Sequence, residues 1–113
     1  MSEVLKILGQ QAPAQTGQLV DLYTVPTNCD ALVRALFVVN RNGNDQTFEA
    51  FVVKAGQQAG NANVLVPGIT VQGNDVLDVL NETAGISLAA GDKIQVRVAA
   101  ATLTFHAFGL ERN

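Results

Sequence analysis

From Leu19 onward, the chain consists mainly of short runs of Val, Leu, Phe and Thr separated by Gly, Asn, Asp or Pro. Such runs, broken about every eight to twelve residues by turn-forming residues, are typical of strands in an all-β domain. We therefore expect an all-β fold. The expected strands cover residues 19–25, 31–40, 47–55, 63–66, 69–72, 76–80, 86–88, 93–99 and 102–110.

Two of these strands differ in how many of their faces are apolar. In the segment DKIQVRVA, three apolar residues alternate with Lys93, Gln95 and Arg97, so we expect one face of this strand to lie in water. The segment ALVRALFVVN is apolar on both faces except at Arg34. This pattern predicts a central strand that is covered by a second sheet or by a neighbouring subunit.

Two connecting segments carry turn signals, and a third segment is ambiguous between a helix and a strand. The Asn-Gly and Asn-Asp pairs in VVNRNGNDQTF predict a hairpin between the flanking strands. In LAAGDKI, Gly91 is expected to adopt a positive φ, and the Asp92 carboxylate is expected to accept backbone N–H groups of the turn. The segment DVLDVLNE fits helical spacing as well as strand spacing, and we favour a strand because Gly73 and Gly85 lie close on either side.

The first eighteen residues differ in composition from the rest. A short apolar run with Val4, Leu5, Ile7 and Leu8 precedes a tract rich in Gln, Ala, Pro and Gly. This composition favours an extended arm over residues 1–18, followed by a single β-sandwich domain over residues 19–113. The arm could pair with a neighbour's exposed sheet edge or within its own sandwich as another strand, and the four apolar residues are candidate contacts with a partner or another copy.

Composition and charge narrow the classes of partner. Only 15% of the 113 residues are charged, against about a quarter in an ordinary soluble domain, so we expect a partner to cover part of the surface. Seven basic and ten acidic residues give a net charge of −3 with no Lys/Arg cluster, which argues against nucleic-acid binding. No apolar segment approaches the roughly 20 residues that span a bilayer. The single Cys29 and the lack of a signal-peptide pattern predict a protein made in a reducing cytoplasm.

Few residues could carry catalysis. A nucleophile would need Cys29 or a serine beside a histidine, and His106 is the only histidine. His106 alternates with apolar residues in an expected strand, so we interpret it as an ordinary sheet residue. Asp75 and Asp78 could form a pair of carboxylates for acid–base chemistry, but aspartate is also common at strand edges and turns. We expect no enzyme activity and no cofactor.

The segment VVNRNGNDQTFE partly matches a calcium-binding EF-hand loop, with Asn40, Asn42, Gly43 and Glu49 at the expected offsets. Val38 stands at the first ligand position, where its side chain cannot coordinate, and strands flank the loop where an EF-hand requires helices. We therefore expect no metal site.

Several ordered phrases are spread along the chain from Leu8 to Glu111: LGQQAPAQTGQLVDLYTVPTNCDALVRALFVVNRN, TFEAFVV, GISLAAGDKIQVRV and LTFHAFGLE. Together they resemble a group of small bacteriophage virion proteins, in which an LYTVP segment opens the first strand and an FGxE phrase closes the chain. The resemblance implies a jelly-roll β-sandwich of about eight strands. It carries over no catalytic residue.

The resemblance also implies a function and partners. The implied function is that of a capsid decoration, cement or staple protein. Such a protein is made in the cytoplasm of the bacterial host and is then located on the virion, at the capsid surface. The expected partners are the major capsid protein or another virion protein, and further copies of the chain in a homo-oligomer. Analogy with other decoration proteins favours a trimer over a dimer. The alternative is a tail-associated module that binds a receptor or a glycan.

Overall fold

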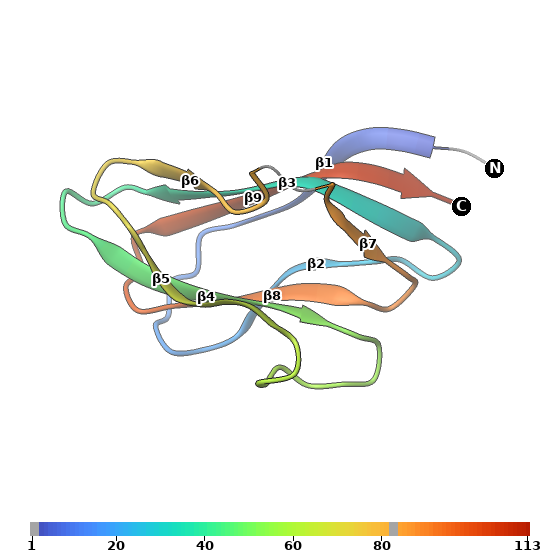
Figure 1. The fold of residues 1–113 in the computed structure, drawn as a ribbon, viewed down its shortest axis with the longest axis horizontal. Helices are drawn as coiled ribbons and strands as arrows, with labels where there is room; N and C mark the ends of the chain where they lie inside the picture. Colours follow the sequence, from blue (N-terminus) through green and yellow to red (C-terminus); the bar gives the residue numbers. More distant parts are fainter. Residues whose placement is uncertain (1–2, 82–83) are drawn as a thin grey trace.

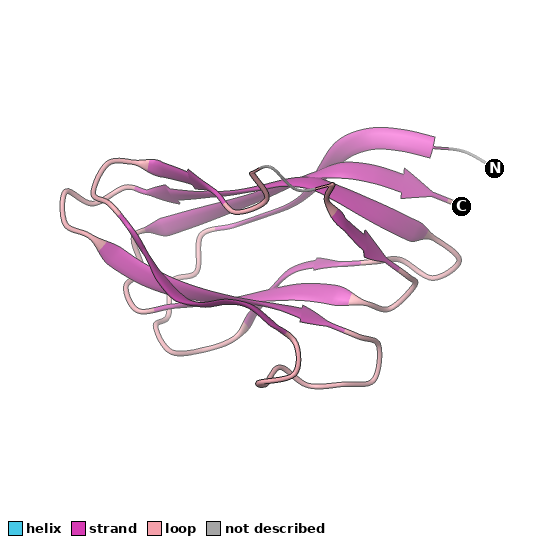
Figure 2. Cartoon of the chain, in the orientation of Figure 1, coloured by secondary structure: helices cyan, strands magenta, loops and turns pink. Residues whose placement is uncertain are grey.

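The computed structural model describes residues 3–81 and 84–113, which contain strands and turns and no helix (Figures 1 and 2). The expectation of an all-β fold is confirmed. Within these residues there is accordingly no helix long and apolar enough to cross a bilayer. The strands are β1 (Glu3–Gln11), β2 (Val20–Thr24), β3 (Asp30–Asn40), β4 (Gln46–Val53), β5 (Val64–Val71), β6 (Val76–Asp78), β7 (Ile86–Leu88), β8 (Lys93–Val98) and β9 (Leu103–Arg112).

The strands form two antiparallel sheets that lie face to face in a β-sandwich arrangement (Figure 1). Sheet A has the order β1-β9-β3, and β6 and β7 both pair with the remaining edge of β3. Sheet B has the order β2-β8-β4-β5. The pairs β1 with β9, β2 with β8, β3 with β6 and β7, and β4 with β5 are nested, so the chain is folded back on itself around the connection between β4 and β5.

Most of the predicted strands match observed ones within a few residues. The segment DVLDVLNE contains β6, which pairs with Phe37–Val39 of β3, so the preference for a strand is confirmed. The two short strands expected over residues 63–66 and 69–72 are one strand, β5, that runs through Pro67 and Gly68. Because β5 is the edge strand of sheet B, it can include a proline, which lacks a backbone N–H.

The N-terminal segment is a strand of the sandwich over Glu3–Gln11. Strand β1 pairs with β9 from Glu3 opposite Arg112 to Gln11 opposite Phe105. Of the two arrangements considered for an extended arm, the structure therefore shows pairing within the chain's own sheet. The physical reason is that β9 would otherwise present an unpaired edge, and that Leu8 packs against the hydrophobic core.

The connection between β3 and β4 is not the hairpin that its Asn-Gly pair predicts. The two strands belong to different sheets, so residues 41–45 carry the chain from sheet A to sheet B. The connection between β7 and β8 also crosses between the sheets, and here the predicted turn chemistry is confirmed. Gly91 has a φ of 85°, and the Asp92 carboxylate accepts the N–H of Ala89 at 2.9 Å.

The core lies between the two sheets and is filled by alternate residues of the strands. The rings of Phe48 in sheet B and Phe105 in sheet A meet edge to face, with centroids 5.6 Å apart. Burial of each such side chain contributes about 1.5–3 kcal/mol to folding. The largest fully buried side chains are Phe48, Phe105, Leu36, Ile94, Leu103, Val25, Val33, Val38, Val53, Val96, Val98 and Asn40.

Asn40 is the buried polar residue in this set, and it joins three segments at one end of the sandwich. Its Nδ2 donates to the carbonyl oxygens of Asn44 at 2.9 Å and Val71 at 3.0 Å. Its Oδ1 accepts the backbone N–H of Asn42 at 3.0 Å. The side chain therefore connects the end of β3 to the crossing segment and to the end of β5.

Replacement of Asn40 by alanine should lower the free energy of unfolding by about 2 kcal/mol, because it leaves the carbonyl of the buried Val71 without this donor and removes the bonds to residues 42 and 44. Urea denaturation measures this loss. Thr70→Ala, at an exposed position of β5, is the control and should change stability by less than about 0.5 kcal/mol. A similarly small loss for Asn40→Ala would contradict the role given to this side chain.

Candidate interaction surface

The residues considered for nucleophilic catalysis do not come together. Cys29 lines a small hollow with Glu111 and Arg112, at the C-terminal end of β9. His106 lies five residues before Glu111 in β9, and five residues of a strand extend about 16 Å. The Nδ1 of His106 lies 2.9 Å from the Nε2 of Gln10. The two side chains therefore do not form a Cys–His dyad.

The residues considered as metal ligands or paired acids have local structural roles. Asn40 is buried, while the carboxylate of Glu49 bonds to Arg97 on the outer face of sheet B. Asp75 accepts the N–H of Val76 at 2.8 Å, and Asp78 accepts the N–H of Leu80 at 3.2 Å. Among the described residues, no three His, Cys, Asp or Glu side chains are grouped so that they could hold a metal ion.

The central part of the outer face of sheet A is apolar, and a charged row, Glu3–Arg112–Asp30, lies at one end. Alternate residues of β9, such as Phe105 and Ala107, are fully buried in the core, so the residues between them face outward. Residues directly opposite one another in paired strands lie on the same side of the sheet. Rows across β1, β9 and β3 therefore share this outer side, and they are Leu5–Leu110–Leu32, Ile7–Phe108–Ala35 and Gln10–His106–Phe37.

We call this surface the apolar face and define it by Leu5, Ile7, Leu32, Phe37, Phe108 and Leu110. On β1, Leu5 is 75% exposed and Ile7 is 54% exposed. The rings of Phe37 and Phe108 meet edge to face at 5.8 Å, and the His106 ring stacks on Phe108 at 6.1 Å. Val39 pairs with the exposed Val76 of β6 and extends the apolar face along β3.

The outer face of sheet B has the opposite character. Lys93, Gln95 and Arg97 of β8 lie outward while the residues between them are buried, so the predicted wet face is confirmed. The Nε of Arg97 lies 2.7 Å from Glu49 Oε1, and its guanidinium lies 5.5 Å from the centroid of the Phe51 ring. The hydrogen bond from Arg97 holds the pKa of Glu49 below its usual value. This face therefore carries charges that are paired within the chain.

A cluster of three polar side chains joins β1 and β9 of sheet A to β2 of sheet B. The Nζ of Lys6 lies 2.6 Å from Glu111 Oε1, and the Tyr23 hydroxyl donates to Glu111 Oε2 at 2.5 Å. These two bonds hold the pKa of Glu111 below its usual value, and the bond from Lys6 has the larger effect. Burial, together with the neighbouring Glu111 carboxylate, raises the pKa of Tyr23. The cluster fixes the edge strand that carries Leu5 and Ile7.

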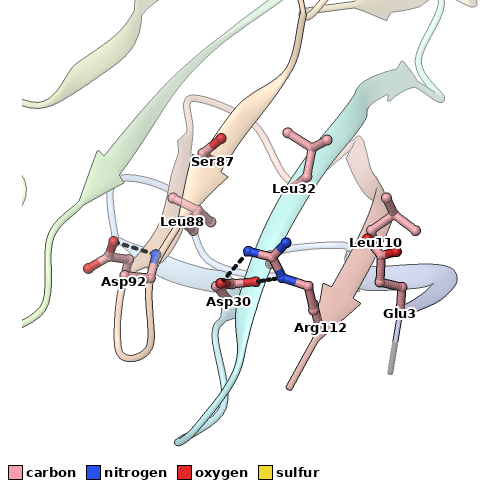
Figure 3. Close-up of a pocket in the computed structure, with 10 residues that line it drawn as sticks. Glu3, Asp30, Leu32, Ser87, Leu88, Asp92, Leu110 and Arg112 are labelled. Atoms are coloured by element: carbon pink, nitrogen blue, oxygen red, sulfur yellow. Dashed lines mark hydrogen bonds and ion pairs between the residues drawn. The ribbon is translucent and has the colours of Figure 1, made fainter. Parts of the chain in front are cut away.

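An open depression lies at the end of sheet A beside β7 (Figure 3). On its floor, Arg112 donates two hydrogen bonds to Asp30, at 3.1 and 3.0 Å. Asp92 accepts the backbone N–H groups of Ala89 and Ala55. The side chains that line it are Glu3, Asp30, Ala31, Leu32, Ser87, Leu88, Ala89, Asp92, Leu110 and Arg112. None of them is aromatic, and the charged groups of residues 30, 92 and 112 already bond within the chain.

The chain matches no protein-family model, and neither curated proteins nor solved structures give a significant match.

The structure places three of the four predicted contact residues at exposed positions of the edge strand β1. Leu5 and Ile7 lie on the apolar face, whereas Val4, opposite Glu111, lies on the other side of sheet A. Val4, Leu5 and Ile7 are all more than half exposed, whereas Leu8 packs partly against the core. The sequence analysis did not identify the residues that β3 and β9 contribute to the apolar face. The segment ALVRALFVVN, which is apolar on both of its faces, was the sequence signal for this surface. Its second apolar face lies on the outer side of sheet A.

The Glu111 cluster predicts a specific pH dependence. Because the pKa of Glu111 is lowered in the folded state, its contribution to stability is present above about pH 4.5, its usual value, and is lost as pH falls below it. Glu111→Gln should therefore lose less stability between pH 7 and pH 3 than the wild type, as measured by urea midpoints. Asp30, Glu49 and Asp92 also have lowered pKa values, so the dependence should shrink and not vanish.

Thr70→Val, which changes an exposed side chain without a titratable group, is the control and should keep the wild-type pH dependence. An unchanged dependence in Glu111→Gln would show that this carboxyl is not stabilised by Lys6 and Tyr23.

Proposed function

We propose that the chain is a non-enzymatic structural protein of a bacteriophage virion, which binds and stabilises the assembled head shell as a decoration or cement protein. The observation that carries this proposal is the difference between the two outer faces of the sandwich. One face is charged and internally paired, while the other exposes apolar side chains over several strands. A body of this kind adheres by burying surface, and it needs no reactive side chain.

We further propose that the sandwich is a jelly roll. Nested pairing of the first strand with the last, and of each following strand with the next one inward, supports this topology. The two additional pairings, β3 with β9 and β4 with β8, are those that close a rolled hairpin into two sheets. The resemblance of the ordered sequence phrases to small phage virion proteins agrees with both proposals.

The mechanism follows from selective binding. A protein that binds the assembled lattice and not the free subunit shifts the equilibrium toward the assembled shell by mass action. The partner in this proposal is the major capsid protein, and the chain acts together with further copies of itself. The residues that we propose to contact partners are at the exposed edge of sheet A: Val4, Leu5 and Ile7, next to the partly buried Leu8.

Particles of the phage that encodes the chain provide the test. Particles that lack the protein should release their genome at a lower temperature than complete particles, and added purified protein should restore the difference. The protein should bind assembled shells but not unassembled capsid subunits, which serve as the matched control. Absence of the chain from purified particles would overturn the proposal.

Electron microscopy of the same particles separates the head from the tail. Density on the shell would support a decoration protein, whereas density confined to the tail would favour the alternative of a receptor- or glycan-binding module. The depression of Figure 3 has no aromatic side chain among its lining residues on which a sugar ring could stack, so it does not favour that alternative.

A further inference from the structure

We propose that the apolar face of sheet A is covered in solution by the same face of a second copy, so that the protein is a two-fold symmetric dimer. This inference rests on the proposed function, of which it specifies the self-association. In such a dimer the apolar face contacts the second copy, and the shell would be contacted at the edge of β1 that carries the exposed Val4, on the other side of sheet A. The two-fold axis would pass through the face approximately normal to the sheet, near the row Ile7–Phe108–Ala35.

The chemistry of the face favours a second copy over a different protein. The rows Leu5–Leu110–Leu32 and Ile7–Phe108–Ala35 are apolar throughout, and the row Gln10–His106–Phe37 ends in Phe37. Interfaces between different proteins are about as polar as the rest of the surface, whereas homodimer interfaces are more apolar. A face with this composition is therefore typical of a surface that is covered throughout the life of the protein.

The size of the face is sufficient for a specific dimer. The eleven residues of β3 extend about 33 Å, and four strands side by side extend about 19 Å. The whole outer side of sheet A, including its charged row Glu3–Arg112–Asp30, thus measures roughly 600 Å² in projection, so two copies in contact over all of it would bury about 1,200 Å². This value reaches the lower end of the range for stable, specific interfaces.

Polar groups also lie on this side of sheet A, and they include Asp78, Ser87 and Thr104, opposite Phe37, Leu32 and Val39. Asp78 accepts the N–H of Leu80 at 3.2 Å.

The other polar groups of this side are paired within the chain or can reach water. Gln10 and His106 bond to each other, so these two groups do not enter the interface unpaired. At the end of the face, Arg112 is paired with Asp30 in a bidentate ion pair. Arg34 is exposed at the bulge of β3, and a long arginine side chain can lie along an apolar surface while its guanidinium remains in water.

Two aromatic residues would be the anchors of the interface. Phe37 and Phe108 contact each other near the centre of the face and come from adjacent strands of sheet A. Buried aromatic residues at the centre of an interface commonly provide most of the binding energy, with a surrounding ring that excludes water. Leu5 and Ile7 of β1, together with Leu32 and Leu110, would form part of that ring.

Sedimentation equilibrium of the purified full-length protein from about 1 to 200 µM tests the inference. The wild type should dimerise with a dissociation constant in this range. Leu5→Glu combined with Ile7→Glu should weaken dimerisation at least 100-fold, because it places charges in the buried face, and should leave the fold intact because both positions are exposed. Val64→Glu combined with Ile69→Glu, at exposed positions of β5 in sheet B, is the matched control and should dimerise like the wild type.

A second variant separates this arrangement from pairing through the free edge of β1. Phe37 is on β3, two strands away from that edge, so Phe37→Asn should weaken a face-to-face dimer at least tenfold and leave an edge-to-edge dimer unchanged. Circular dichroism and thermal melting verify that each variant is folded. A wild-type monomer at 200 µM, a trimer, or a dimer that tolerates Phe37→Asn would overturn the inference.

The outcomes distinguish this inference from the proposed function. A protein that is found on phage particles but is monomeric in solution would remove the dimer and leave the function. A stable dimer that never occurs on particles would support the dimer and remove the function.

Discussion

Strand β9 and its pairing on both sides are the constraint on which the rest of the structure depends. It is bonded to β1 along one edge and to β3 along the other, over most of its ten residues. Alternation along this single strand sends Phe105 into the core and Phe108 to the outer face. The same strand supplies Glu111 to the cluster that joins the two sheets and Arg112 to the ion pair with Asp30. A shift of one residue in its register would exchange the core and the outer surface.

The function proposed for the chain follows from what this arrangement leaves on its two outer faces. On sheet B, charges such as Arg97 and Glu49 satisfy one another, and such a face is stable in water without a partner. On sheet A, the outward residues of β3 and β9 include Leu32, Phe37, Phe108 and Leu110, and such an apolar group is unusual for a surface that stays in water. The candidate catalytic residues Cys29 and His106 lie apart: Cys29 lines a hollow beside Glu111, and His106 lies 2.9 Å from Gln10. The adhesive role that we propose rests on the apolar face of sheet A.

Much of the fold could be predicted from the sequence, because strands and turns are encoded locally. The alternation in DKIQVRVA located both the buried and the wet side of β8, and Gly91 and Asp92 marked the turn before it. The fate of the N-terminal segment could not be predicted, since pairing within the sheet depends on the free edge of β9, about a hundred residues away in the chain. The Asn-Gly pair misled for a similar reason. A local turn signal does not say whether the next strand joins the same sheet, and here Asn40 supports a crossing to the other sheet.

The candidate surface was the part least accessible to sequence reasoning, because three strands distant in the chain build it together. Solvent paramagnetic relaxation enhancement of methyl groups in the concentrated protein tests most directly whether this surface is the adhesive one. The methyl groups of Leu5, Ile7 and Leu110 should be protected from a soluble relaxation agent, relative to their exposure in the isolated chain, while those of Val64 and Ile69 in sheet B should not be. Equal accessibility of the two sets would contradict the adhesive role of this surface.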